Sequence, residues 1–484
     1  MEKHKPSYKS KLQVSKFSLS FLTCCVIGLL ALNIIGIQAP IANSQTLSQQ
    51  LTLDLSQVSP VNSLVGTDTD FFLSPEDPSN EAVWSAVADI GIPVLRFPGG
   101  EGDWYDWKTG AIPSSGPGPE TFGVREKPQT KNVALDAFIS HARNVNASVT
   151  YVLNILDSPE SIQNLALHWQ QTNAPVQWVE LGNEYYLSSQ VIGGATGYLQ
   201  HARQAVQALR AGNFKGPVGI GLAPVGAPGA PQFDFGAQWN QELAMANTQD
   251  FDAVILHYYP WVQTVGFETD YQKGPAGLIA TVKTAQKQFA GKQIWLTEWN
   301  LGPPVDVPEF NSLVHAMFDL RMLQAILDSG IDMSCYHVLT GIGWELLGPD
   351  QLTLSYSSST HMLRRVPFFA FKELLQAKKN GAYLANQTPI NEFEYMAFLK
   401  NSEINIVAWT RNNISTTIAI NLPGYTTQFL GGEALQGQLL DNNGSFLSKI
   451  SGSIPWTEKI VPTAIHTPVL SGSGIVLLRF SFVP

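Results

Sequence analysis

Hydrophobic residues in the region 60–340 gather in short apolar runs that alternate with longer amphipathic stretches. The runs PVLRF (93–97) and VQWVEL (176–181), for example, have the length and composition of buried strands. The stretches between the runs have apolar residues at helical spacing, and several end at a glycine, a common helix stop. We therefore expect strands at residues 63–68, 93–97, 148–154, 176–181, 217–223, 252–259, 292–299 and 332–339.

Strands that alternate with helices in this way predict an α/β fold, and eight such strands favour a (β/α)8 barrel, or TIM barrel. An open, doubly wound sheet has the same alternation of elements. Sheets of that kind often carry a glycine-rich phosphate loop after the first strand, and no such loop follows residues 63–68. The barrel is therefore the preferred interpretation, with the doubly wound sheet as the alternative.

The pattern changes after about residue 380. Short segments such as INIVAWTR (404–411) and GIVLLRFSFV (474–483) alternate apolar and polar residues between Asn, Gly, Pro and Ser turns. This is typical of an antiparallel β-sandwich. We therefore divide the chain into a barrel at 45–378 and a C-terminal sandwich, with a structural packing role, at 379–484. The segment QLTLDLSQV (50–58) also alternates, and we expect it to pair with the sandwich.

The first 44 residues have the pattern of an export signal. Five lysines up to Lys16 precede an apolar run at 17–37, and the tripeptide Ala-Asn-Ser at 42–44 is a small-x-small cleavage pattern. The apolar run is long enough to span a bilayer if it is not removed. We expect a secreted, periplasmic or extracellular protein, with membrane anchoring through residues 17–37 as the alternative.

Composition argues against several other classes of protein. With 44% hydrophobic and 14% charged residues, the chain is too apolar to be disordered. Its net charge is −10, and the first 44 residues carry +4, so the remainder carries −14, which disfavours binding to nucleic acid or anionic lipid. Cys335 is the only cysteine after the apolar run, so we expect no intramolecular disulfide framework.

Polar residues follow several of the predicted barrel strands, and barrel enzymes place their reactive groups at the C-terminal strand ends. The motif LGNE ends the fourth strand with Glu184, and WLTEWN ends the seventh with Glu298. Strands four and seven are three apart in an eight-stranded ring, so these two carboxylates can converge across its mouth. Further candidates at strand ends are Arg96, Asn154, Asn183, His257 and Tyr259.

Two convergent carboxylates indicate glycoside hydrolysis, because its oxocarbenium-like transition state needs one proton donor and one anion. Aromatic rings at the rim fit this chemistry, since they stack on sugars. The sequence has no HExxH metal motif, no GxSxG elbow and no GKS or GKT phosphate loop, and we expect no metal or organic cofactor. The tryptophans just after strand ends are Trp104, Trp107, Trp261, Trp299 and Trp344.

The motifs LGNE and WLTEWN resemble the acid/base and nucleophile motifs of the large clan of retaining glycosidases built on (β/α)8 barrels. The segment LRFPGGEGDWYDWKTGAIP (95–113) is similar to the one after the second strand of α-L-arabinofuranosidases, with echoes in the heparanase and β-glucuronidase-like and the β-xylosidase families. The resemblance covers nearly the whole chain after the export segment. It implies cleavage of O-glycosidic bonds in oligo- or polysaccharides by double displacement.

The same resemblance implies a role for each matching residue. Glu184 would be the general acid/base, and Glu298 would be the nucleophile. Arg96 and Tyr259 would hold Glu298 ionised and oriented, and Asn183 would hydrogen-bond the sugar 2-hydroxyl. Together with rim residues, the set that we expect to contact the sugar is Asn183, Arg96, Asn154, His257, Tyr259, Trp299, Glu101 and Trp344.

One position departs from the arabinofuranosidase pattern. That family usually has Asn after its paired glycines, and here Glu101 follows Gly99 and Gly100. An extra carboxylate at the rim changes the contacts with the sugar, so the substrate of the family does not carry over. Arabinofuranosidase-like and glucuronidase-like activities both stay open. A uronic acid would need a cation in the pocket, and the candidates in the second loop are Arg125, Lys127 and Lys131.

Three other polar residues have structural interpretations. Glu180 shares the strand face of Glu184, and we expect it in a buried ion pair with Arg96. His315 and His337 are assigned to structure. Two alternative functions also remain at this stage: a non-catalytic barrel that binds polysaccharide or associates with a cell wall, and a transglycosylase that uses the same residues.

Overall fold

The structure, a computed structural model, describes most of the chain after the predicted export segment. Residues 1–46 lie outside the described part. Within the described part, no helix is both long and apolar enough to cross a bilayer. The described residues are 47–59, 63–72, 74, 78–113, 132–228, 234–261, 265–302, 312–341, 345–349, 362–379, 381–385, 393–411, 416–436, 454–456, 469–470 and 473–483.

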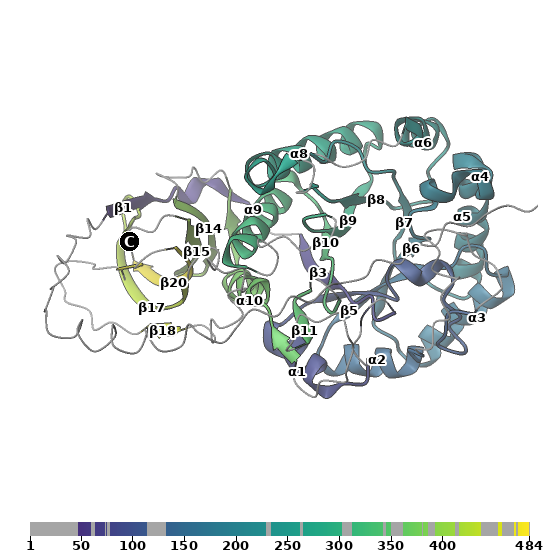
Figure 1. Ribbon diagram of the computed structural model, residues 1–484, viewed down its shortest axis with the longest axis horizontal. Helices are drawn as coiled ribbons and strands as arrows, with labels where there is room; N and C mark the ends of the chain where they lie inside the picture. The colour runs from purple at the N-terminus through teal and green to yellow at the C-terminus, as the bar shows by residue number, and fades with distance from the viewer. Residues whose placement is uncertain are drawn as a thin grey trace, which may run out of the picture. The chain divides into compact units, whose positions relative to one another are not determined.

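Parallel strands form a closed barrel in which each strand pairs with the next one along the chain (Figure 1). The last strand pairs with the first, with Met333 opposite Leu64, and this closes the ring. The (β/α)8 prediction is confirmed, and the alternative of an open, doubly wound sheet is wrong. The strands are β3 (Leu64–Asp68), β4 (Val94–Phe97), β5 (Ser148–Leu153), β6 (Val176–Leu181), β7 (Val218–Gly221), β8 (Ala253–Tyr258), β9 (Gln293–Trp299) and β10 (Met333–Tyr336).

Helices cover the outside of the barrel (Figure 1). The side chains of Asn80, Ser158 and Ser312 accept backbone hydrogen bonds at helix starts. Gly91 and Gly330 end two helices in the left-handed conformation, with φ of 74° and 75°. The helices are α1 (Glu81–Ile90), α2 (Leu135–Asn144), α3 (Pro159–Gln171), α4 (Ser189–Ile192), α5 (Gly194–Ala211), α6 (Asp234–Met245), α8 (Phe267–Gln288), α9 (Leu313–Ser329) and α10 (Val366–Lys378).

Two further sheets form the C-terminal sandwich. In spatial order, the larger sheet contains β18 (Ile454–Trp456), β17 (Thr426–Gln436), β20 (Gly474–Val483), β15 (Glu403–Thr410), β14 (Phe393–Lys400), β13 (Ala382–Leu384) and β2 (Val58–Ser59), and the smaller contains β1 (Leu47–Thr52), β16 (Thr416–Asn421) and β19 (Val469–Leu470). β1 runs parallel to β16, so the segment before the barrel contributes to the sandwich. A separate pair joins β11 (Leu347–Pro349) to β12 (Met362–Arg364).

The larger sheet of the sandwich buries both of its faces. Ile404 on β15 belongs to the core of the sandwich, together with Leu51 of β1. Trp409 on the same strand belongs instead to the large core that includes the barrel helices. Because successive residues of a strand point to opposite faces, β15 is covered on both sides. An ion pair of 2.8 Å between Arg321 of α9 and Glu394 of β14 adds a polar contact.

Replacing Leu51 by alanine is expected to lower the free energy of unfolding by about 2–5 kcal/mol, the usual cost of truncating a buried leucine. Leu51 is fully buried between the two sheets of the sandwich. Met245→Ala is the matched control, because that side chain is 79% exposed and should change the free energy by less than about 0.5 kcal/mol. Urea unfolding followed by circular dichroism measures both, and equal effects would contradict a sandwich core that depends on β1.

Candidate active site

The interior of the barrel is built in layers. Apolar side chains, among them Val94 of β4, Trp295 of β9 and Cys335 of β10, fill its lower part. Two residues further along two of these strands are Arg96 and His337. Because residues two apart in a strand share a face, a polar layer lies directly above the apolar one. It lies toward the C-terminal strand ends, where barrels place their sites.

A single buried arginine connects the carboxylates of this polar layer. Nη1 of Arg96 donates to Asp68 Oδ2 at 2.6 Å and to Glu298 Oε1 at 2.8 Å. Nε and Nη2 each donate to Glu180 at 3.0 Å, and Nη2 also donates to Asn183 Oδ1 at 2.8 Å. The predicted ion pair between Glu180 and Arg96 is therefore confirmed. Three carboxylates share one guanidinium, an arrangement of charge-assisted hydrogen bonds.

Glu298 reaches this layer because β9 contains a β-bulge. Leu296 lies opposite Leu256 of β8, but the next residue of β8, His257, lies opposite Glu298. β9 therefore has one extra residue at this point. Strict alternation would place Glu298 on the face of Leu296, which packs in the core with the helices. The bulge instead brings both Thr297 and Glu298 to the interior, where Thr297 Oγ1 lies 3.3 Å from His257 Nε2.

The neighbours of Glu298 keep its carboxyl group ionised. The Tyr259 hydroxyl donates to Glu298 Oε2 at 2.7 Å. Burial alone would raise the pKa of this carboxyl group. The charges of His257, Arg96 and His337, together with the tyrosine hydrogen bond, outweigh burial and lower the pKa of Glu298 from 4.5 to about 2. The side chain is therefore an anion at neutral and mildly acidic pH.

Glu184 follows β6 in a tight turn. Gly182 and Glu184 have positive φ values of 83° and 48°, and the left-handed conformation costs a non-glycine residue about 1–3 kcal/mol. The buried carboxylate of Asp103 accepts a hydrogen bond from Asn183 N at 2.9 Å and so holds the turn. The Tyr186 hydroxyl donates to Glu184 Oε1 at 2.5 Å. The Glu184 side chain remains 23% exposed.

The carboxylates of Glu184 and Glu298 approach each other across the mouth of the barrel. One oxygen of each lies within 4.8 Å of the other. His257 lies beside both, with Nδ1 at 2.8 Å from Glu184 Oε1 and 3.4 Å from Glu298 Oε2. Its Nε2 faces Thr297. Since protein groups engage both ring nitrogens, His257 is better described as a residue that positions the two glutamates than as a sugar ligand.

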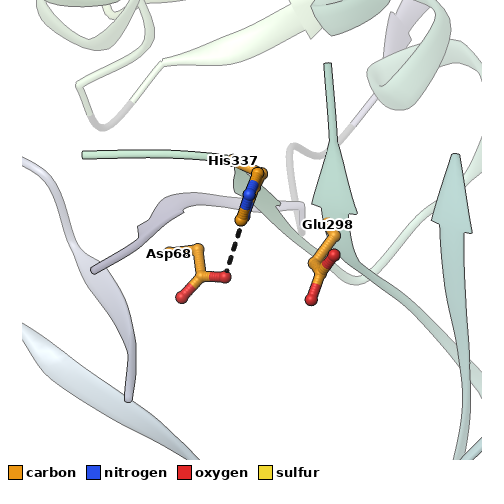
Figure 2. A group of neighbouring side chains, drawn as sticks. All are labelled: Asp68, Glu298 and His337. Carbon is orange, nitrogen blue, oxygen red and sulfur yellow. Dashed lines mark hydrogen bonds and ion pairs between the residues drawn. The ribbon is translucent and has the colours of Figure 1, made fainter. Parts of the chain in front are cut away.

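Asp68 and His337 are site residues that sequence reasoning missed. His337 Nδ1 lies 3.1 Å from Asp68 Oδ2 (Figure 2). Ligand-type atoms of Asp68, His337 and Glu298 lie within 4.8 Å of one another. His337, expected to be structural, is therefore beside Glu298. The available signal was position, because Asp68 ends the first barrel strand and His337 directly follows the last.

Two groups of side chains in this site have the donor types of a metal centre. They are Asp68, Glu298 and His337, and Glu184, His257 and Glu298. Arg96 donates to both carboxylates of the first group and to Glu298 of the second. A cation in either place would meet the positive charge of that guanidinium and compete for the same oxygens. We therefore interpret both groups as hydrogen-bonded acid networks.

Trp299 lies away from the site, contrary to expectation. It is fully buried and stacks on Phe371 of α10, with ring centroids 5.9 Å apart. The bulge that turns Glu298 inward turns the following residue outward, so the expected contact between Trp299 and the sugar is wrong. Trp104 is also a core residue, whereas Trp107 and Trp261 are half-buried.

The other predicted residues divide between the site and the undescribed parts of the chain. Arg96, Asn183 and Tyr259 lie with the two glutamates, as the contacts above show. Asn154 follows β5, where its Oδ1 accepts a hydrogen bond from Leu156 N at 3.0 Å. Glu101 lies in the short helix η2 (Gly100–Asp103), but its side chain is outside the described part. The predicted residues that lie entirely outside it are Arg125, Lys127, Lys131 and Trp344.

Solved structures that are similar to this chain include glycoside hydrolases. A family 51 arabinofuranosidase from Xanthomonas axonopodis pv. citri has a TM-score of 0.61 at 12% identity, over 90% of this chain and 99% of its own. An α-L-arabinofuranosidase from Thermotoga maritima has a TM-score of 0.62 at 15% identity, over 89% and 99%. A 4-O-α-L-rhamnosyl-β-D-glucuronidase from Fusarium oxysporum has a TM-score of 0.59 at 15% identity, over 90% and 100%.

These likenesses establish a shared fold. The chain has the (β/α)8 barrel and C-terminal sandwich of barrel-type glycoside hydrolases. No protein-family model matches the sequence, and no curated protein sequence matches it either.

Replacing Arg96 by glutamine is expected to lower the free energy of unfolding by about 3–5 kcal/mol, because it leaves three buried carboxylates without their shared cation. The matched control is Arg203→Gln. It removes a surface ion pair with Asp250, in which the side chains of Arg203 and Asp250 are 36% and 52% exposed. This change should lower the free energy of unfolding by less than about 1 kcal/mol. Urea unfolding compares the two variants, and a similarly small cost for both would contradict the central place of Arg96.

Proposed function

We propose that this protein is a retaining glycoside hydrolase that cleaves O-glycosidic bonds in oligo- or polysaccharides. The observation that carries the proposal is the approach of Glu184 and Glu298, whose carboxylate oxygens come within 4.8 Å. Retaining enzymes hold their two carboxyl groups about 5–5.5 Å apart, whereas inverting enzymes need about 6.5–9.5 Å to admit a water molecule. The close approach of the two side chains supports the shorter separation.

The surroundings of the two glutamates suit two different roles. Glu298 is 8% exposed, its pKa is lowered to about 2, and its oxygens accept hydrogen bonds from Arg96 and Tyr259. These are the properties of an anionic nucleophile. Glu184 is more exposed, and Tyr186 and His257 both contact its Oε1. The proton of the general acid is therefore assigned to Oε2 of Glu184.

In the first step, Glu298 attacks the anomeric carbon and forms a glycosyl ester while the bond to the leaving oxygen breaks. Glu184 gives its proton to that oxygen. In the second step, Glu184 takes a proton from water, which attacks the anomeric carbon and releases Glu298 as a carboxylate. Asn183, held by Arg96 at 2.8 Å, is assigned to the sugar 2-hydroxyl.

The sugar is assigned only by class. The similar structures include arabinofuranosidases and a glucuronidase, so arabinofuranosidase-like and glucuronidase-like activities are the two candidates. The protein is also assigned to the outside of the cytoplasm, either secreted or anchored through residues 17–37, from the sequence pattern of its first 44 residues.

Hydrolysis of a panel of aryl glycosides by the mature chain tests this function. The panel contains arabinofuranoside, xyloside, glucuronide, glucoside and galactoside. Activity on one sugar that yields product of the same anomeric configuration supports the proposal, whereas inverted product contradicts it. Polysaccharides that bind without being cleaved would favour the non-catalytic alternative, and transfer to sugar in preference to water would favour a transglycosylase.

Alanine variants of the two glutamates are expected to behave differently. Glu184→Ala should lower kcat/KM by about 10²–10⁴-fold for substrates with poor leaving groups. The loss should be far smaller for a dinitrophenyl glycoside, because its dinitrophenolate leaving group departs without protonation. Azide should then speed the reaction and give a glycosyl azide of retained configuration. Glu298→Ala should abolish hydrolysis of both substrates. Steady-state kinetics and product NMR measure these effects, and an active Glu298→Ala would sink the assignment.

A further inference from the structure

Asp68 and His337 form a pair beside the proposed nucleophile that the steps above leave unused. Asp68 Oδ2 accepts from Arg96 at 2.6 Å and lies 3.1 Å from His337 Nδ1. Asp68 ends β3 and His337 directly follows β10, and these two strands close the barrel. The backbone also fixes both residues, since Leu339 N donates to Asp68 O at 2.7 Å and His337 N donates to Trp299 O at 3.1 Å.

The buried charges around this pair carry a negative excess that a charged His337 reduces. Asp68, Glu180 and Glu298 are carboxylates whose side chains are 0%, 1% and 8% exposed. The guanidinium of Arg96 contacts all three. One cation against three anions leaves an excess of two negative charges, and an uncompensated buried charge is costly. In the described part of the site, two imidazoles are the groups that can supply the missing positive charge.

We propose that His337, held by Asp68, is a positioning residue whose proton halves this negative excess and keeps Glu298 anionic for attack. The inference rests on the proposed role of Glu298. Asp68 orients the ring through Nδ1 and stabilises its imidazolium form. The imidazolium acts on Glu298 through space, over the distance of less than 4.8 Å between their polar atoms.

The direction of titration of both groups supports this arrangement. Burial alone would lower the pKa of His337, but the hydrogen bond to Asp68 and the charges of Glu298, Asp68 and Asp70 raise it above 6.5. The charge of His337 in turn lowers the pKa of Glu298. The other titratable groups around the pair, Arg96 and Glu298 are Asp70 after β3, Glu180 of β6, Glu184 after β6, His257 of β8 and Tyr259 directly after β8.

The sign of the effect follows from these neighbours. When the charge of His337 is removed, the pKa of Glu298 rises, so the anion is lost at a higher pH. The acid limb of the kcat/KM profile, which reports the nucleophile of the free enzyme, should therefore move upward. A purely structural role would lower kcat/KM by the same factor at every pH and leave the limb in place.

Three variants test the pair through the pH profile. His337→Asn is expected to move the acid limb upward by about one pH unit, a tenfold loss on that side of the profile. Asp68→Asn/His337→Asn removes one negative and one positive charge, so the limb should return to within about 0.3 unit of the unmodified enzyme. His201→Asn on α5 is the control and should leave the profile unchanged. An unmoved limb in His337→Asn would overturn the proposal.

An NMR titration of histidine-labelled protein tests the same pair without any substrate. The His337 signal, assigned by its loss in His337→Asn, is expected to titrate above pH 6.5, the ordinary value for histidine, and at a lower pH in Asp68→Asn. A neutral His337 at pH 6.5, or an equal midpoint in Asp68→Asn, would overturn the proposal.

The two experiments separate this inference from the proposed function. Activity that survives in Glu298→Ala would remove the nucleophile assignment, and the link from His337 to catalysis with it, even if the NMR titration finds the imidazolium held by Asp68. If Glu298 is confirmed as the nucleophile but the acid limb does not move in His337→Asn, the inference is overturned and the glycosidase proposal stands.

Discussion

The guanidinium of Arg96 is shared by carboxylates from three other strands of the barrel, and the rest of the site takes its geometry from this interaction. Removing the arginine and the acids from water is costly, and only short hydrogen bonds on every side offset that cost. The bonds to Asp68, Glu180 and Glu298 are 2.6–3.2 Å long. They join β4 to three other strands of the ring, β3, β6 and β9. The position of Glu298 is therefore set by the barrel rather than by a loop.

The two glutamates differ because they lie in different surroundings of the barrel mouth. Glu298 lies at the end of a strand, within the hydrogen-bonded charge layer. Glu184 lies one step outside, in a turn held by the carboxylate of Asp103, and is more exposed. A pair of identical side chains thereby obtains two different environments, a buried one whose pKa is lowered to about 2 and a more exposed one, and such a difference is the general basis on which paired carboxylates divide acid and nucleophile roles.

The arrangement of strands could be predicted from sequence, because the buried runs of the barrel are short, apolar and evenly interrupted. The approach of Glu184 and Glu298 could be predicted with it, because both lie at the C-terminal ends of barrel strands. The ion pair between Arg96 and Glu180 also followed, since strand periodicity placed Glu180 on the face of Glu184, inside the barrel, where a buried carboxylate needs a cation. The bulge in β9 could not be predicted, because an extra residue in a strand leaves no mark on its composition. Trp299 was therefore assigned to the wrong face. The position of His337 beside Asp68 and Glu298 was missed because only closure of the ring brings the first and last barrel strands together.

The parallel pairing of β1 with β16 has a consequence for how the chain acquires its structure. Leu47 is among the first described residues, and its partner Thr416 comes after the whole barrel. The strand is synthesised early but has no neighbour to pair with until the whole barrel and then β13, β14 and β15 have been synthesised. Contacts of such sequence separation form late and slow folding. The sandwich is therefore not an independent module. A C-terminal fragment that begins after the barrel would lack β1, so the edge of β16 that pairs with β1 would be exposed and open to association with other chains.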